Sequence, residues 1–112
     1  MLSEFARLLG ALAALAAPVH HHRPPMRHAW ADSTCYSQGG TTASGKQARF
    51  GEVAMNSLPL WSHIRLDRPV FGRRRYVVED RIGWGSQLDI YYDSESACLA
   101  YGRHRIGYVV SR

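Results

Sequence analysis

Six short runs of apolar and β-branched residues, each bounded by turn-forming residues, constrain the fold of this chain more than any other feature. Runs of this length between clusters of Gly, Pro, Asn, Asp and Ser are typical of strands. Many short strands with such spacing favour a closed barrel or a sandwich. The sequence therefore predicts a mainly β fold of six strands. The predicted strands cover residues 33–37, 52–55, 63–66, 75–79, 87–92 and 106–110.

The segment after the fifth run carries the signals of a helix instead. Ser94 can cap the first turn with its side chain, and Glu95 places an acidic group in that turn. Gly102 can end the helix because glycine readily takes a positive φ. We therefore predict one short helix between Ser94 and Gly102.

The N-terminal part has the features of an export signal and a linker. Residues 1–17 contain Arg7 and then an apolar run that ends in small residues suited to cleavage. The run is short for a bilayer span, and an amphipathic or buried helix is the alternative. Residues 18–29 contain adjacent prolines and no apolar periodicity, which predicts an extended linker. We therefore expect an exported protein of the periplasm, cell envelope or exterior, with its folded domain at residues 30–112.

Two cysteines, Cys35 and Cys98, stand near the two ends of the predicted domain. A domain of about eighty residues has only a marginal core. In an oxidising compartment the two thiols can form a bridge, which over so long a loop would add a few kcal/mol. We therefore predict a disulfide. Two buried thiols that never meet are the alternative, because spacing alone does not show proximity.

The formal net charge is +5, and residues 73–75 form the one dense basic run, three consecutive arginines. Such a run suits polymers that carry phosphates or carboxylates. No nucleic-acid motif accompanies the charge, so an anionic polymer of the cell envelope fits better than DNA. The alternative is an exposed turn that the charge keeps soluble.

Two aspartates flank a stretch that is punctuated by glycines. Asp80 ends the fourth run and Asp89 lies within the fifth, although Asp is depleted in strands. In the fifth run Leu88 and Ile90 share one face, and Asp89 lies on the other. If the apolar face fills the barrel, Asp89 faces outward, and the turn around Trp84 lets the two strand ends approach. We expect both carboxylates to flank one cleft.

The chain resembles the three-aspartate (3D) domain family in four successive stretches, CYSQGGTTASG, VAMNSLPLW, VVEDRIG and LDIYYDS followed by ACLAYG. The likeness covers about residues 34–110, and it is most specific in TASG at 42–45 and in the strand–helix run 88–102. The family includes the catalytic part of membrane-bound lytic transglycosylase A. Its barrel is shared with rare lipoprotein A, barwin and expansins. The resemblance implies a small six-stranded double-psi β-barrel with one short helix.

The family pattern supplies three aspartates, of which the second falls at Asp80 and the third at Asp89. The first falls at Asn56, Trp61 stands where the family usually has glycine, and the loop between the two aspartates is shorter than usual. In the lytic transglycosylases the third aspartate protonates the leaving oxygen. It then removes the proton of the substrate's C6 hydroxyl, which leaves a 1,6-anhydro sugar. The resemblance therefore implies Asp89 as catalytic acid/base, with Asp80 as the supporting carboxylate.

Such an acid must hold its proton near neutral pH. Burial against Tyr91 and Trp84, or repulsion from Asp80, would raise the pKa of Asp89. A nearby Arg81 would lower it. The sequence leaves this balance open.

A glycan groove suits aromatic faces and backbone that a ligand can approach closely. Core packing is the alternative for Tyr36, and a turn carboxylate bonded to local N–H groups is the alternative for Asp80. We expect no cofactor and no metal site, since the cysteines and histidines lack ligand spacing. The candidate substrate-binding residues are Tyr36, Thr42, Gly45, Asn56 and Tyr91.

The sequence thus predicts a monomeric, exported protein that acts on peptidoglycan or another cell-wall glycan and cleaves it in the manner of a lytic transglycosylase. A non-catalytic glycan-binding module of the expansin or rare lipoprotein A type is the alternative, which Asn56 and Trp61 favour. A weaker alternative is an interaction or defence domain like barwin, with recognition by residues 73–75. If the cleft needs a carboxylate at position 56, Asn56→Asp should raise activity, and like-charge repulsion should shift the pH optimum upward. If Asn56 only holds a turn, the substitution should leave activity alone.

Overall fold

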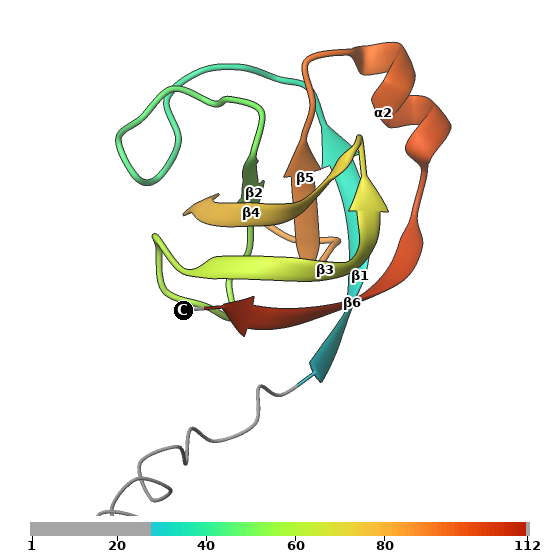
Figure 1. Cartoon of the computed structure of the whole chain (residues 1–112). Helices are drawn as coiled ribbons and strands as arrows, with labels where there is room; N and C mark the ends of the chain where they lie inside the picture. Colours follow the sequence, from blue (N-terminus) through green and yellow to red (C-terminus); the bar gives the residue numbers. More distant parts are fainter. Residues whose placement is uncertain (1–27, 112) are drawn as a thin grey trace, which may run out of the picture.

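The computed structural model of the protein describes residues 28–111, which form six strands and one helix (Figure 1). Each predicted strand and the predicted helix is present at its place in the chain. The barrel begins slightly before the predicted domain start, because His28 and Ala29, the end of the predicted linker, belong to the first strand. The rest of the predicted linker and the predicted export signal lie outside the described residues. The elements are β1 (His28–Tyr36), β2 (Glu52–Ala54), β3 (His63–Val70), β4 (Arg73–Asp80), β5 (Leu88–Tyr91), α2 (Glu95–Tyr101) and β6 (His104–Ser111).

The six strands close into a barrel in the order β1–β5–β2–β4–β3–β6, and β6 pairs back with β1. The pairs β1–β5 and β2–β4 are parallel, and the other pairs are antiparallel. Exchanging β1 with β4, β2 with β5 and β3 with β6 turns every pair into another pair of the same barrel. Two three-strand halves therefore interlock with pseudo-two-fold symmetry, as a double-psi barrel requires, and the predicted fold class is confirmed.

The core of the barrel is formed by one face of each strand. Along β5, Leu88 and Ile90 are fully buried while Asp89 between them lies on the outer face, as the alternation predicted. Val53 of β2 stands in register with Ile90 on one side and with Val78 of β4 on the other. Removing such side chains from water is the main stabilising contribution, about 25 cal/mol for each Å² of apolar surface. Further fully buried core residues are Ile64, Leu66, Tyr76 and Ile106.

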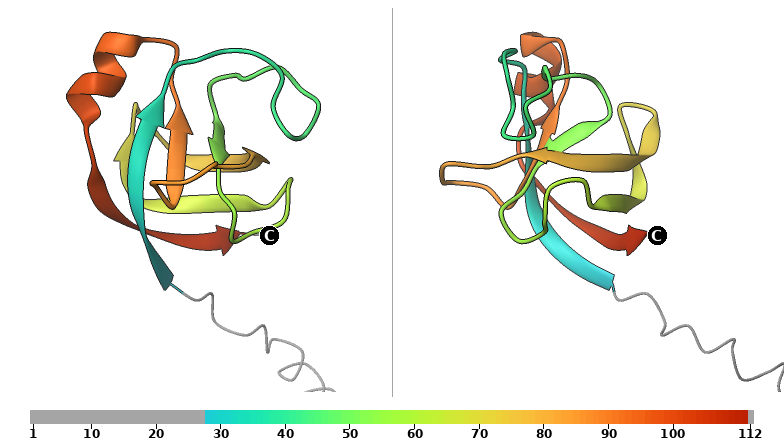
Figure 2. Two further views of the ribbon diagram at one scale, coloured as in Figure 1. Left: turned by 180° about the vertical axis from the view of Figure 1, so that it is seen from behind. Right: turned by 90° about the vertical axis from the view of Figure 1, so that its left-hand side faces the viewer.

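The connections are unevenly distributed around the barrel. The 37–51 connection and α2 both lie at the end where β1 and β5 finish (Figure 1). The 81–87 loop between β4 and β5 projects away from the barrel in the right-hand view of Figure 2.

Within the described part of the chain, no helix is long and apolar enough to cross a membrane.

Helix α2 has the predicted ends. The Ser94 side chain accepts a hydrogen bond from the Ala97 N–H at 3.1 Å, which satisfies one of the free donors of the first turn. After the helix, Gly102 has φ 68°, and its N–H donates to the Cys98 carbonyl at 3.2 Å. These two caps limit the helix to two turns, so it fits between β5 and β6.

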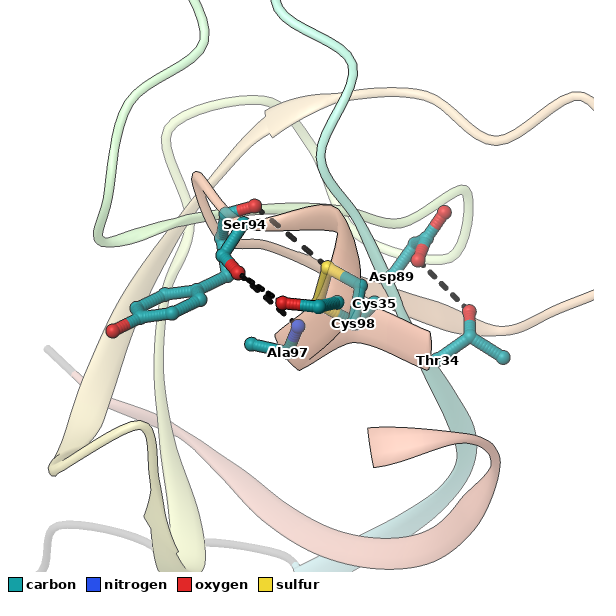
Figure 3. The surroundings of a disulfide bond; sticks show 8 residues. Thr34, Cys35, Asp89, Ser94, Ala97 and Cys98 are labelled. Atoms are coloured by element: carbon teal, nitrogen blue, oxygen red, sulfur yellow. Dashed lines mark hydrogen bonds between the residues drawn. A yellow bond between two sulfur atoms is a disulfide. The ribbon is translucent and has the colours of Figure 1, made fainter. Parts of the chain in front are cut away.

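A disulfide joins α2 to β1 and confirms the predicted pairing (Figure 3). Cys35 and Cys98 are 63 positions apart, and their Cα atoms are 4.9 Å from each other. On β1, Cys35 lies between Thr34 and Tyr36, whose side chains point to the opposite face of the strand. The bridge therefore anchors the strand that supplies two residues to the site described below.

Candidate functional site

Asp80 and Asp89 lie opposite the same residue of the barrel wall. Ala54 of β2 is in register with Asp80 of β4 on one side and with Asp89 of β5 on the other. Side chains of directly opposed residues share one face of a sheet, and neighbouring strands are about 4.8 Å apart. The two carboxylates therefore stand on the outer face of the barrel, on either side of the small, buried Ala54 side chain.

A β-bulge places Asp80 at this position. The register between β2 and β4 shifts just before Ala54, so Glu79 is an extra residue on β4. The buried Glu79 side chain instead accepts a hydrogen bond from the Arg49 guanidinium at 2.5 Å. With regular pairing, Glu79 would oppose Ala54. Bulges commonly redirect side chains next to functional sites, and this one brings Asp80 into line with Asp89.

Both aspartates open onto one cleft of about 370 Å³. The 81–87 loop forms one wall, and it carries Trp84, whose side chain is 91% exposed. Gly85 next to this residue has φ 99°, a conformation that favours glycine. The structure thus brings the two predicted carboxylates together beside an exposed aromatic ring. The lining residues are Tyr36, Gln38, Gly39, Ala54, Asp80, Arg81, Ile82, Gly83, Trp84 and Asp89.

Backbone groups hold the Asp80 carboxylate. Its Oδ1 accepts hydrogen bonds from the N–H groups of Ala43 and Arg81, both at 2.9 Å. Its Oδ2 lies 3.4 Å from the Tyr36 hydroxyl oxygen. Asp80 therefore has the backbone bonding of a turn carboxylate and also faces the cleft, so the two interpretations of this residue are compatible.

Asp89 is held from the other side by Thr34. The two residues are in register on β5 and β1, and the Thr34 hydroxyl donates to Asp89 Oδ1 at 2.8 Å (Figure 3). Burial raises the pKa of the Asp89 carboxyl, and the like charge of Asp80 adds to this effect. The Thr34 hydrogen bond and the charge of Arg103 oppose it. Burial dominates, so Asp89 holds its proton to a higher pH than a free aspartate does.

Arg81 does not approach Asp89 in the way the sequence allowed. Its guanidinium donates to the carbonyl oxygens of Met55 at 2.7 Å and of Leu58 at 2.6 Å. The cation that acts on Asp89 is instead Arg103. Arg81 therefore fixes the segment that follows β2, where its side chain binds two backbone carbonyls, while the residue still contributes to the cleft lining.

Sequence reasoning missed a third carboxyl group, that of Glu52. It lies on the same face of β2 as Ala54, it is 0% exposed, and its Oε2 accepts the Tyr36 hydroxyl at 2.5 Å. Burial raises the pKa of Glu52 to about 7 and also raises the pKa of the Tyr36 hydroxyl. A glutamate at the start of a short apolar strand was the available signal, since such residues are rarely buried without a partner.

Tyr91, a predicted binding residue, does not line the cleft. It is buried and packs edge-on against Tyr36, with 5.4 Å between the ring centroids. Burial raises the pKa of its hydroxyl. Tyr91 therefore supports the ring of Tyr36, which does line the cleft.

Thr42 and Gly45, also predicted to bind substrate, form a turn behind Asp80. The Thr42 hydroxyl donates to the Lys46 carbonyl at 2.8 Å, and the Gly45 N–H donates to the Thr42 carbonyl at 2.9 Å. The φ of 90° at Gly45 explains the glycine in this turn. The turn presents the Ala43 N–H to Asp80. These residues position a donor for the cleft carboxylate and do not line the cleft.

Asn56 lies outside the lining of the cleft as well. Its amide Nδ2 donates to the Ile82 carbonyl at 2.8 Å, and its Oδ1 accepts the Ile82 N–H at 2.9 Å. It borders a separate hollow of about 290 Å³, together with Trp30 and Gln87. The side chain thus anchors the start of the 81–87 loop, on which Trp84 is carried.

Comparisons with protein-family models, curated proteins and solved structures found no match. Among residues 28–111, no three His, Cys, Asp or Glu side chains gather as a metal ion would require. The chemistry of the cleft indicates what the site can do. That chemistry consists of a half-buried carboxyl with a raised pKa, a second carboxylate held by backbone donors, and an exposed tryptophan.

Proposed function

We propose that this protein cleaves the glycan strands of peptidoglycan in the manner of a lytic transglycosylase, with Asp89 as the acid/base. The observation that carries the proposal is the position of Asp89 and Asp80 on either side of Ala54 in one cleft. Breaking a glycosidic bond requires a proton for the leaving oxygen and stabilisation of an oxocarbenium-like centre. The raised pKa of Asp89 suits the first task, and the backbone-held Asp80 carboxylate suits the second.

In this reaction Asp89 gives its proton to the glycosidic oxygen while the bond from that oxygen to C1 breaks. The Asp89 carboxylate then takes the proton of the C6 hydroxyl on the same sugar, and the C6 oxygen bonds to C1. The products are a 1,6-anhydro sugar end and a new hydroxyl on the departing chain, and no water is consumed. Thr34 binds Asp89 Oδ1, so we assign the proton transfer to Oδ2.

Trp84 supports a sugar polymer as the substrate. Aromatic faces pack well against the apolar faces of sugar rings, and this ring is almost fully exposed at the rim of the cleft. The glycines on both sides, Gly83 and Gly85, let the loop adjust to a ligand. Export to the cell envelope is part of the same proposal. The predicted signal at residues 1–17 and the Cys35–Cys98 disulfide support it, because disulfides persist in oxidising compartments.

Digestion of purified peptidoglycan tests the proposal. The soluble products are analysed by mass spectrometry across acidic, neutral and mildly alkaline buffers. We expect muropeptides with 1,6-anhydro ends, each lighter by one water than the corresponding hydrolysis product. Folded protein that releases no glycan fragment in any of these buffers would rule out the enzyme.

A glycan-binding module without catalysis is the second candidate, and the exposure of Trp84 is the observation that favours it. Binding to insoluble wall material should then survive Asp89→Asn and fall strongly in Trp84→Ala. Trp61→Ala is the matched control, because Trp61 is also exposed, at 46%, but does not line the cleft. Equal binding by the two tryptophan variants would remove Trp84 from the binding surface.

A further inference from the structure

A buried carboxyl group lies behind the cleft, near Asp80. The Glu52 side chain has no exposed surface, and its Oε2 is 2.5 Å from the Tyr36 hydroxyl oxygen. Its Oε1 has no hydrogen-bond partner among the described residues. The same Tyr36 oxygen is 3.4 Å from Asp80 Oδ2. The Tyr36 hydroxyl therefore lies between a hidden carboxyl and a carboxylate of the cleft.

One hydroxyl proton cannot serve both neighbours. When Glu52 is ionised it can only accept, so Tyr36 donates to it and has no proton left for Asp80. When Glu52 is protonated, its own O–H can donate to the Tyr36 oxygen. The Tyr36 O–H is then free to turn toward Asp80 Oδ2. The proton on Glu52 thus changes the number of donors that Asp80 receives.

We propose that Glu52 is a positioning residue of the cleft, which acts through Tyr36 to give or withhold a third hydrogen bond to Asp80. The other two are the backbone bonds to Asp80 Oδ1. The inference deepens the proposed function and rests on it in one respect, namely that Asp80 supports the reaction at Asp89. The exchange of hydrogen bonds itself requires no substrate. A proton from solvent binds the Glu52 carboxylate, the new Glu52 O–H donates to the Tyr36 oxygen, and the Tyr36 O–H turns from Glu52 to Asp80. No other covalent bond forms or breaks.

The surroundings of Glu52 place this exchange in the neutral pH range. Burial is the largest of the effects that together raise the pKa of Glu52 to about 7. The neighbouring carboxylates on β4 raise it as well, while the Tyr36 hydrogen bond and the one nearby arginine lower it. The titratable and charged groups around Glu52 are Tyr36 on β1, Asp80 and Glu79 on β4, Tyr91 on β5 and Arg49 just before β2.

NMR of the protein with labelled tyrosine rings tests the relay, with the ring carbon bonded to the Tyr36 hydroxyl as the reporter. In the parent protein we expect its chemical shift to change with a midpoint near pH 7, because the hydroxyl changes partner there. Glu52→Gln keeps the shape of the side chain and supplies an N–H donor at every pH. We expect this variant to lose the transition, whereas Asp89→Asn, the control, should keep it.

The NMR chemical shift of the Glu52 carboxyl carbon provides a second measurement, which does not require Glu52→Gln to fold. Tyr36→Phe removes a hydrogen bond that lowers the pKa of Glu52, so its midpoint should rise. Asp80→Asn removes a like charge that raises this pKa, so the midpoint should fall. A Tyr36 transition that persists in Glu52→Gln would overturn the relay, as would a Glu52 midpoint that neither substitution moves. Normal titrations in a protein that cleaves no glycan would count against the proposed function alone.

Discussion

Asp80 and Asp89 belong to strands that are not paired with each other, yet both oppose Ala54, because β2 runs between β4 and β5. Both strands pair with β2, so their register against β2 sets the spacing of the two aspartate side chains, and the length of chain between the aspartates does not. The strand between them, the bulge at Glu79 and the small side chain of Ala54 set it. The barrel topology thereby determines the geometry of the candidate active site.

Ala54→Leu should block the space between the two carboxylates. Three added carbons at a position that is 3% exposed must either protrude into the cleft or overpack the wall, which costs about 1–3 kcal/mol. We expect strongly reduced glycan cleavage in protein that is still folded by circular dichroism. Ala54→Gly is the control, because it leaves the space open and should retain cleavage despite a stability loss of about 1 kcal/mol. Parent-like cleavage by Ala54→Leu would show that substrate does not occupy this space.

Asn56→Asp should lower stability, because aspartate cannot replace the donor of the asparagine amide. The bond from Nδ2 to the Ile82 carbonyl would be lost, and a carboxylate oxygen would face that carbonyl. We expect a decrease of about 0.5–1 kcal/mol in the free energy of unfolding at neutral pH, measured with urea, because the hydrogen bond is exposed. The pH optimum should stay unchanged, since Asn56 lies outside the cleft lining. Unchanged stability together with an upward shift of the optimum would instead place Asn56 in the site.

Replacing both Cys35 and Cys98 by serine should destabilise the barrel. The bridge spans 63 positions, so its loss releases the entropy of a long loop in the unfolded chain, which corresponds to about 4 kcal/mol. Urea unfolding of the parent protein with and without reductant provides the same comparison without mutation. A difference below about 1 kcal/mol in both experiments would show that the bridge contributes little to stability.

Glu52→Gln should stabilise the protein above neutral pH and not at acidic pH. The pKa of Glu52 rises on folding to about 7, so the folded state binds this proton more tightly than the unfolded chain does. The resulting stability is complete below the pKa of the unfolded group and is lost as pH rises through the folded value. Glutamine does not titrate, so the variant should gain on the order of 2 kcal/mol at mildly alkaline pH. Urea unfolding at several pH values measures this difference, and a constant difference would contradict it.

The strands and the helix could be predicted because their signals are local. In β5, Leu88 and Ile90 alternate with Asp89, and burial follows the same alternation. In α2, Ser94 and Gly102 stand at the two ends, where their side-chain and backbone properties are needed. The position of Asp89 on the outer face follows from such local rules alone.

The details of the site depend on contacts between distant strands, which local rules do not contain. Nothing near Glu79 in the sequence indicates a bulge, because the shift is defined only against β2. Glu52 acquires its significance from Tyr36, which lies on another strand. Asn56 matches a family aspartate in the sequence, but in the structure its amide binds the Ile82 backbone. Residue type therefore identified the carboxylates, whereas strand register determined their neighbours.

Digestion of peptidoglycan in water enriched in heavy oxygen tests the role of Asp89 most directly, with the parent protein compared to Asp89→Asn. We predict that the parent releases 1,6-anhydro ends that carry no heavy oxygen, since the C6 hydroxyl replaces water. Folded Asp89→Asn keeps the shape of the side chain but lacks the proton donor, so it should release these ends at least about 100-fold more slowly. Newly formed reducing ends that carry heavy oxygen in place of the anhydro ends, or undiminished release by Asp89→Asn, would contradict the assignment of Asp89 as the acid/base of a lytic transglycosylase.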